Sequence, residues 1–304
     1  IGGIMKTKIN FQFPNHVSPR YMQPLFLKLE SGIWYGSPEL RNILQLSFPN
    51  IEGKEIVYNN IETWSLVGLG NYKVENTQGR KAYFKITDLG KQIQETYSTN
   101  QELFFELMHF FFYSPWKKRN FPQLGRFWVY SRACDILWDV SPTQMDSFGL
   151  ASTLQQESQE IFAGYFPKFS ERSVRSVFPW LTTFTPPFLI KKSTQKELSS
   201  TKREYCSPQL FHLALDLLFN QKQLKYGTSM AIGDEEIRSV CRVCLLNEGQ
   251  FWEMADRTKM IIRGVDIRRG QFSTSIALEM KPQWIDLPDF TQEIEFEGLE
   301  GEEE

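Results

Sequence analysis

The chain has 304 residues, of which 41% are hydrophobic and 14% aromatic, and its formal net charge is −2. This length and hydrophobic content suit a folded protein of about two domains and exclude an intrinsically disordered chain. The longest apolar run, residues 103–113, contains Glu106 and His109 and is too short to cross a bilayer, so no transmembrane helix is predicted.

The charge is unevenly distributed along the chain. The last fourteen residues, 291–304, hold seven Glu and no Lys or Arg, which leaves 29 acidic and 34 basic residues in the rest. Residues 1–133 alone hold 16 basic and 10 acidic residues. This distribution is consistent with a basic surface that binds nucleic acid and an acidic tail that competes for that surface. It is equally consistent with a tail that stays solvated.

Three helical patterns followed by a two-stranded ribbon occupy residues 18–90. The first helix starts at Ser18-Pro19, the second at Ser37-Pro38 and the third at about Lys54. Residues 71–86 then alternate around a turn as a hairpin. This order predicts a winged helix, in which one helix can enter the major groove of DNA while the ribbon lies along the phosphates.

Polar side chains of this unit are candidate DNA contacts. Basic residues on the wing suit phosphates, and amide side chains on the third helix suit adenine edges. The predicted contacts are Tyr58, Asn59, Asn60 and Thr63 on the helix, and Lys73, Arg80, Lys81 and Lys85 on the wing. Because winged helices also serve as protein-docking modules, the same unit could instead bind a partner protein.

Two helices are predicted over 88–97 and 100–113, the second apolar on nearly every side and stopped by Ser114-Pro115, and a helical middle region follows over 117–192. Residues 117–132 interleave basic with aromatic side chains. They either hold a nucleic-acid strand by charge and stacking, or form a solvated connector whose aromatics enter the core. The candidate contacts in this segment are Lys117, Lys118 and Arg119.

A polar stretch over 193–206 is predicted as a linker, after which the opening pattern returns in outline. Ser207-Pro208 starts a helix, two more helices follow, and residues 260–280 form a hairpin around Arg268-Arg269-Gly270. We therefore predict a second winged helix over 207–285. Its phosphate contacts are Arg268 and Arg269.

The whole chain is thus predicted to be mainly helical with small β-hairpins, an α+β protein with two winged-helix units joined by a helical middle region. The predicted divisions are 1–116 for the N-terminal winged helix and the helices after it, 117–192 for the middle region, 193–206 for the linker, 207–285 for the second unit and 286–304 for the acidic tail. Each unit would supply its own wing.

Little in the sequence points to catalysis. No phosphate-binding loop, dinucleotide fingerprint or nucleophile motif occurs, so no catalytic residue, metal or cofactor is predicted. Cys241 and Cys244 with Cys206 and His212 could be arranged as a zinc site, but they lie in apolar helical patterns, which favours buried thiols. His109 is predicted to be a core histidine. Scattered cysteines and a start without a signal-peptide pattern predict a cytoplasmic protein.

Short motifs at residues 13–21 (FPNHVSPRY), at Asn60 with Trp64, at residues 87–90 (TDLG) and at His109 carry a family resemblance. With them the chain resembles an uncharacterised bacterial family, a winged-helix-like domain of unknown function encoded beside PAPS-reductase-like proteins in DNA phosphorothioation and related anti-phage islands. The family often has Gly-Lys-Asn before its tryptophan helix, where this chain has VYNN. The resemblance implies a DNA-linked or complex-building role and carries over no catalytic residue.

Two hypotheses follow. The first is a non-enzymatic DNA-binding subunit of a bacterial anti-phage defence or DNA-modification complex, which contacts duplex phosphates through its basic wings. The alternative is a scaffold subunit that docks a partner effector, CRISPR-like or PAPS-reductase-like, without touching DNA. Salt separates the two, because phosphate binding weakens steeply with salt and apolar docking does not.

Overall fold

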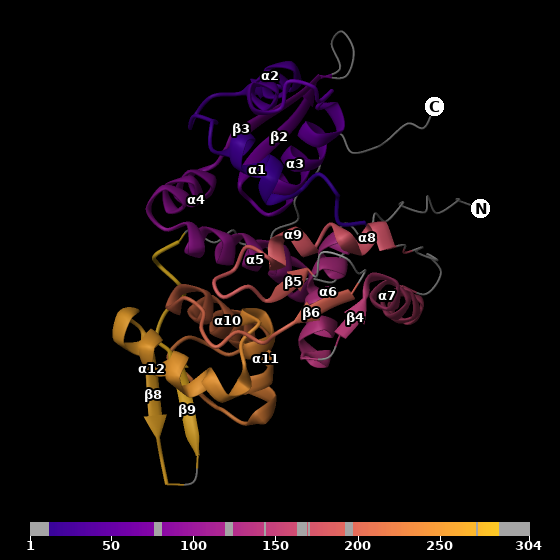
Figure 1. The fold of residues 1–304 in the computed structure, drawn as a ribbon. Coiled ribbons are helices and arrows are strands. Elements are labelled where there is room, and N and C mark those ends of the chain that lie inside the picture. Colours follow the sequence, from indigo (N-terminus) through magenta and orange to yellow (C-terminus); the bar gives the residue numbers. More distant parts are fainter. Residues whose placement is uncertain are drawn as a thin grey trace, which may run out of the picture.

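The computed structural model describes residues 12–75, 81–118, 124–142, 144–162, 169, 171–191, 197–271 and 273–285. The protein is mainly helical with small antiparallel sheets, as predicted (Figure 1). An N-terminal unit and a C-terminal unit lie at opposite ends of the molecule, with the helices of the middle region between them (Figure 1). Arg80, Arg119, the acidic tail and most of residues 9–13, where weak alternation predicts a strand, lie outside the described residues.

The N-terminal unit has the predicted order of helices and hairpin. Its elements are α1 (Pro19–Phe26), β1 (Tyr35–Gly36), α2 (Ser37–Ser47), α3 (Lys54–Leu66), β2 (Gly70–Glu75) and β3 (Lys81–Ile86). The three strands form an antiparallel sheet in the order β1-β3-β2. The two-residue strand β1 was not predicted from the sequence, because so short a segment shows no alternation.

The middle of the chain is built from helices and one small sheet. Its elements are α4 (Asp88–Thr99), α5 (Gln101–Lys118), α6 (Gly125–Val140), β4 (Gln144–Asp146), α7 (Ser147–Ile161), α8 (Glu171–Arg175), α9 (Phe178–Leu181), β5 (Leu189–Lys191) and β6 (Glu197–Ser200). The expected stop at Ser114-Pro115 is wrong, because α5 continues through Pro115 to Lys118. Packing on every side of α5 outweighs the local preference of proline.

The structure also differs from the linker predicted over 193–206. Strand β6 lies in this range and pairs with β4 on one side and β5 on the other. Farther along, Arg203 is buried and pairs through its backbone with Leu245 and Asn247. Residues 193–196 of the predicted linker lie outside the described residues. Residues 197–206 are not an open connector, since strand β6 is held by two neighbouring strands and Arg203 is buried in the core.

The C-terminal unit repeats the order of the first. Its elements are α10 (Pro208–Gln221), β7 (Ser229–Ala231), α11 (Asp234–Cys244), the 3₁₀ turn η2 (Glu248–Gln250), α12 (Phe251–Ile261), β8 (Val265–Arg269) and β9 (Thr274–Leu278). The sheet order β7-β9-β8 corresponds to β1-β3-β2 of the first unit. The hairpin of β8 and β9 projects away from the rest of the molecule (Figure 1).

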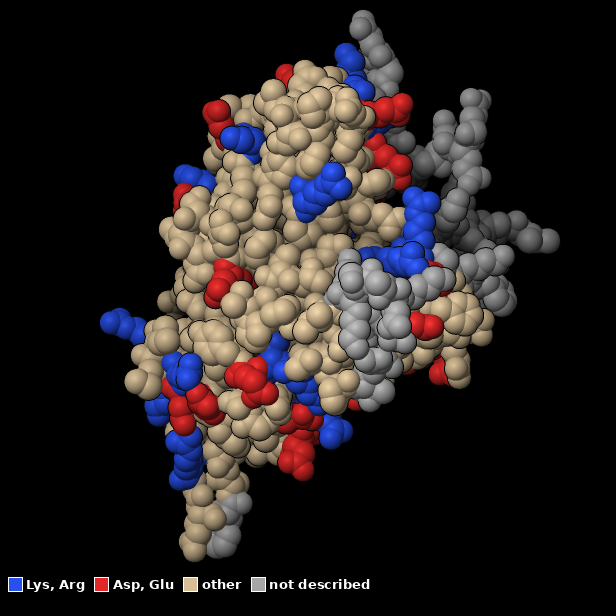
Figure 2. Space-filling model, in the orientation of Figure 1, with Lys and Arg blue, Asp and Glu red and all other residues tan. Residues whose placement is uncertain are grey.

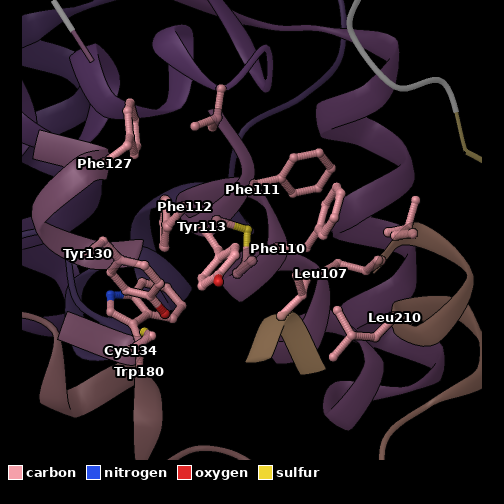
Figure 3. Close-up of a cluster of buried hydrophobic side chains, with 14 of the residues drawn as sticks. Leu107, Phe110, Phe111, Phe112, Tyr113, Phe127, Tyr130, Cys134, Trp180 and Leu210 are labelled. Carbon is pink, nitrogen blue, oxygen red and sulfur yellow. The ribbon is translucent and has the colours of Figure 1, made fainter. Parts of the chain in front are cut away.

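Aromatic residues of α5 and α6 form the centre of the core (Figure 3). The ring of Phe112 lies 4.9 Å from that of Trp180 and 5.6 Å from that of Tyr130, measured between centroids. Phe13, from the segment before α1, packs on Phe112 at 5.2 Å. Each such aromatic side chain buries roughly 150–250 Å². The high aromatic content of the sequence therefore serves the core.

Side chains of α5 and α6 hold the end of α11. The last carbonyls of a helix have no partner within the helix. Here His109 Nε2 donates to the Val243 carbonyl at 2.9 Å, and just beyond the helix Trp138 Nε1 donates to the Leu246 carbonyl at 2.8 Å. Because a carbonyl only accepts, His109 must carry its proton on Nε2, and its Nδ1 accepts from the Tyr130 hydroxyl at 3.1 Å. The predicted core histidine is therefore confirmed, and it joins two parts of the molecule.

A buried ion pair connects α5 to the chain between the two ends of the protein. Arg203 Nη2 lies 2.5 Å from Glu106 Oε1, and both side chains are less than 5% exposed. The other carboxylate oxygen of Glu106 accepts from the Ser207 backbone at 2.9 Å, just before α10. Glu106 therefore positions both the connecting segment and the start of α10.

We expect Arg203→Met to destabilise the protein by about 3–5 kcal/mol, because Glu106 is then left as a buried charge without its partner. Urea unfolding followed by circular dichroism measures this loss. The matched control is Arg238→Met, at a side chain 58% exposed, which should change the free energy of unfolding by less than about 0.5 kcal/mol. A similar small change for both variants would contradict the role given to the pair.

His109 also predicts a pH dependence of stability. Burial lowers its pKa from 6.5 to about 4. The unfolded chain therefore binds a proton more readily than the folded one, so the stabilising effect is complete above pH 6.5 and is lost as the pH falls to about 4. The difference corresponds to about 3 kcal/mol. His109→Gln should remove this part of the pH dependence, as measured by urea unfolding at a series of pH values. A variant that follows the parent curve over this range would refute it.

Candidate nucleic-acid interface

A hollow of about 1220 Å³ lies in the N-terminal unit between α2, the start of α3 and the sheet. Its walls come mainly from α2, the loop before α3 with the first turns of that helix, and strands β2 and β3. The lining includes His16, Tyr21, Gly36, Ser37, Pro38, Glu39, Arg41, residues 50–58, Tyr72, Lys81, Ala82 and Tyr83. The sequence-predicted residues Tyr58 and Lys81 are thus brought together at this hollow.

Three basic side chains around the hollow have no ion pair among the described residues. They are Arg41 on α2, Lys54 on α3 and Lys81 on β3. Among the lining carboxylates, Glu39 accepts from the Gly36 backbone at 2.9 Å and so caps α2, and Glu55 lies 3.7 Å from His16. Glu52 lines the hollow as well. The three unpaired bases come from three different elements and are available to an anionic ligand.

The start of α3 brings a further partial positive charge to the hollow, whose lining holds three bases and three carboxylates. The residue before the helix, Gly53, has φ +73° and offers no side chain to accept from the first N–H groups. The N-terminus of a helix carries a partial positive charge and free N–H donors, which favour anions such as phosphate. Lys54 is the first residue of α3, so its positive charge adds to that of the free N–H donors.

The wing carries a second, adjoining patch of basic and aromatic residues. The Lys73 ammonium lies 4.9 Å from the centre of the Trp34 ring and 5.2 Å from that of Tyr83. Lys85 approaches the same Trp34 ring at 5.2 Å. Lys73 also pairs with Glu75 at 2.7 Å. Tyr83 belongs to both the patch and the hollow, so Lys73 and Lys85, two of the three predicted wing lysines, lie in a patch that adjoins the hollow.

The prediction that Asn60 and Thr63 face DNA is wrong, since both side chains are fully buried. Asn60 Nδ2 donates to the carbonyls of His16 and Ile56, each at 2.8 Å. Thr63 lies against Arg126 from α6 at 3.3 Å. These polar residues hold the segment before α1 and helix α6 against α3. Their faces could not be told from the sequence because apolar residues occur all around this helix.

The middle region covers the second half of α3. Arg126 is 5% exposed and lies 2.9 Å from Glu62, one turn beyond Tyr58. Tyr58 and Asn59 remain partly exposed on the first half of the helix, where Tyr58 contacts Tyr72 edge to face. Only the beginning of α3 is therefore open to a large ligand.

The middle-region candidates do not join this surface. Lys117 Nζ lies 2.6 Å from Asp135, a buried carboxylate that also accepts from the Tyr113 hydroxyl. Lys117 thus neutralises an internal charge, which corrects its assignment as a phosphate contact. Lys118 belongs to α5, but its side chain lies outside the described residues.

The bases of the second wing are exposed but paired with acids. Arg268 lies 2.9 Å from Asp266, and Arg269 lies 2.6 Å from Asp256. Lys259 also reaches Asp266, at 3.0 Å. These neighbours lower the pKa of Asp266, first through the hydrogen bond from Arg268. Figure 2 shows Lys and Arg along the projecting hairpin with Asp and Glu beside them, so this surface has mixed charge.

Within the described ranges, no group of three or more His, Cys, Asp or Glu side chains is placed to hold a metal ion. The cysteines are free and buried, and burial raises the pKa of the Cys241 and Cys244 thiols. No helix in this part of the chain is both long and apolar enough to span a membrane.

The comparisons with known proteins identify a shared fold. No protein-family model matches the chain, and no curated protein matches it. A solved structure of a protein named SspB is similar, with a TM-score of 0.59 and 12% sequence identity over 90% of this chain and 85% of that one. At this identity the likeness concerns the fold, and it extends over both units and the middle region.

Substitution of the adjacent residues Asn59 and Asn60 tests which side chains of α3 are buried. Asn60→Ala should destabilise the protein by about 1–3 kcal/mol, because the His16 carbonyl loses its donor while the Ile56 carbonyl keeps only its helical N–H partner. Asn59→Ala, at the neighbouring and partly exposed position, should stay within about 0.5 kcal/mol of the parent. Urea unfolding of the two variants measures the difference. Equal effects would mean that Asn60 is not the buried member of the pair.

Proposed function

We propose that this protein binds duplex DNA, with residues 19–86 and 208–278 acting as two winged helices. Both units have the order helix, short strand, helix, helix and hairpin, and the same sheet order supports the assignment. In a helix-turn-helix protein, the last helix of the three approaches the major groove. The protein acts in this proposal by binding, as a subunit of a larger complex.

The observation that carries the proposal is the set of unpaired bases around the hollow of the N-terminal unit. Arg41, Lys54 and Lys81 lie on separate elements beside the start of α3, so together they match an extended anion better than a point charge. A phosphate backbone is such an anion, and contacts to it give affinity without sequence readout. Lys73 and Lys85 would extend the contact along the wing.

The buried half of α3 limits how DNA can be read. Because Arg126 covers Glu62 and Thr63, we infer that only the first half of α3 reaches into a groove. Of the predicted base contacts, Tyr58 and Asn59 are the two that remain. Binding is therefore expected to depend mainly on phosphates and to discriminate weakly between sequences.

We infer the biological setting from the family resemblance. Residues 13–21 and 87–90 resemble a bacterial family encoded in DNA phosphorothioation and anti-phage islands, which supports a subunit of a cytoplasmic defence or DNA-modification complex. The likeness to SspB supports a conserved arrangement of both units around the middle region. The partners in this proposal are duplex DNA and other subunits of the complex.

A second candidate function, protein docking, is favoured by the C-terminal unit. Its wing bases already have acidic partners, and Met260 and Ile261 at the end of α12 are 85% and 64% exposed. Exposed apolar side chains beside a projecting hairpin suit a protein partner such as a CRISPR-like or PAPS-reductase-like effector. In this candidate function the second unit docks a partner without touching DNA.

The test is binding of a labelled duplex to the full chain, titrated with salt. Lys54→Glu/Lys81→Glu should lower the affinity at least about tenfold and reduce the slope of log affinity against log salt by about 2, since each phosphate contact contributes about 0.9. The matched control is Lys28→Glu/Lys225→Glu, which reverses two exposed lysines away from the hollow. It has the same net charge as the test variant.

Three outcomes decide between the hypotheses. Loss confined to the Lys54/Lys81 variant supports DNA contact at the hollow. Equal loss in both variants would show that only net charge matters and would remove the hollow from the proposal. No binding by the parent chain, even at low salt, would contradict the hypothesis of direct DNA contact and leave the protein-docking hypothesis.

A further inference from the structure

Three aromatic side chains of the N-terminal unit lie outside the hydrophobic core. Trp34, just before β1, is 38% exposed, and Tyr58 and Tyr83 are partly exposed. None of the three belongs to the core, in contrast to Trp64 and Phe84 of the same unit. Packing of the core therefore does not account for the position of these three rings.

The strand register brings aromatic and basic side chains of the wing to one face. Residues at alternate positions of a strand point to the same side of a sheet, so Lys81, Tyr83 and Lys85 share one face of β3. Lys73 lies opposite Tyr83 in the register of β2 and β3. The centre of the Trp34 ring lies 4.9 Å from the Lys73 ammonium and 5.2 Å from that of Lys85. This outer face of the wing therefore alternates basic with aromatic side chains.

The two lysines hold Trp34 with one side open. Both ammonium groups reach the ring from the hairpin, so the exposed part of the side chain is turned away from the sheet. The attraction between each ammonium and the ring keeps the indole in place before a ligand arrives, which lowers the ordering cost of binding. A flat ring held in this way can stack on another flat ring.

The outer face of the wing is continuous with the hollow of the N-terminal unit. Tyr83 and Lys81 belong to that face and also line the hollow. Tyr58 lies in the hollow, together with the basic residues Arg41 and Lys54. Aromatic and basic side chains thus follow one another from the wing into the site proposed for DNA.

A surface of this kind suits an unpaired strand better than a duplex. Lysines bind the phosphates of either form, but an aromatic ring stacks on a base only where the face of that base is free. In a duplex the neighbouring base pairs cover this face. Glu52 and Glu55 in the hollow repel phosphates, whereas they can accept from the amino groups of unpaired bases, whose Watson–Crick edges are free.

We propose that the outer face of the wing and the adjoining hollow bind an unpaired stretch of DNA. Its bases stack on Trp34 and Tyr83, and its phosphates lie at the three lysines of the wing, Lys73, Lys81 and Lys85. This inference rests on the proposed function, because it concerns the same site and names the form of DNA that the site takes. Contacts to the duplex on either side then place the unpaired stretch.

The test compares the binding of two DNAs of equal charge to the full chain. One is a duplex interrupted by a single-stranded stretch of about six thymidines. In the other the same positions are abasic, so the phosphates remain and the bases are gone. The thymidine DNA should bind at least about tenfold more tightly, since stacking of a base on even one ring is worth roughly that factor. A 2-aminopurine placed among the thymidines should lose fluorescence when it stacks on the protein.

Trp34→Leu should remove most of this preference. Binding of the thymidine DNA should weaken about fivefold to fiftyfold, while binding of the abasic DNA changes less than about twofold, because the ring contacts only bases. Trp34→Phe, which keeps a ring, should restore part of the preference and of the fluorescence change. Urea unfolding shows whether the variants are folded.

The matched control is Tyr205→Leu. Tyr205 is also 38% exposed and also lies beside a basic residue, with Arg257 at 5.5 Å from the centre of its ring. It precedes α10 and is not part of the wing or the hollow. Tyr205→Leu should therefore leave the affinity for both DNAs unchanged.

Equal binding of the thymidine and abasic DNAs by the parent chain overturns the inference, and the proposed function stands if a blunt duplex is still bound. An undiminished preference in Trp34→Leu/Tyr83→Leu also overturns it. Tighter binding of a stretch of ribonucleotides than of the thymidines would overturn the assignment to DNA. Binding of the thymidine DNA without binding of a blunt duplex supports the inference and contradicts the duplex as ligand. No binding of any of these DNAs would refute both.

Discussion

An α-helix that is apolar on every face has to be surrounded by protein, and α5 is such a helix. Its residues Phe104, Phe111 and Phe112 are fully buried, and so are its polar residues Glu106 and His109. A buried polar group is costly without a partner. The partners are Arg203 and the Val243 carbonyl, both from the later half of the chain. The packing of one helix thereby determines where the C-terminal unit is attached.

This attachment gives two units of the same order different surroundings. In the first unit, α6 approaches α3 and Arg126 covers its second half. In the second, the equivalent helix α12 ends in exposed Met260 and Ile261, and its hairpin projects from the molecule (Figure 1). Similar topology therefore does not give similar ligand-binding surfaces, because the middle region masks one unit more than the other.

Local signals in the sequence predicted the helices and hairpins of both units well. Ser37-Pro38 and Lys54 mark the starts of α2 and α3 as the structure has them. The failures arise where tertiary contacts decide. Pro115 stays helical because other parts of the protein pack around α5. Strand β6 forms because it pairs with β4 on one side and β5 on the other. The site was only partly predictable for the same reason. Tyr58 and Lys81 meet at the hollow, while Asn60 is turned inward by carbonyls that are distant in sequence or a helical turn away.

The two hairpins differ less in their number of basic residues than in whether those residues are paired with carboxylates. An exposed ion pair contributes little to stability, so a phosphate could displace Asp266 from Arg268 at little direct cost. The displaced carboxylate nevertheless stays nearby and repels the phosphate, which reduces the gain. Lys54 and Lys81 form no such pair among the described residues, although Glu52 and Glu55 line the same hollow. If both wings lie on one duplex, the first therefore contributes most of the salt dependence, and the second contributes mainly to orientation.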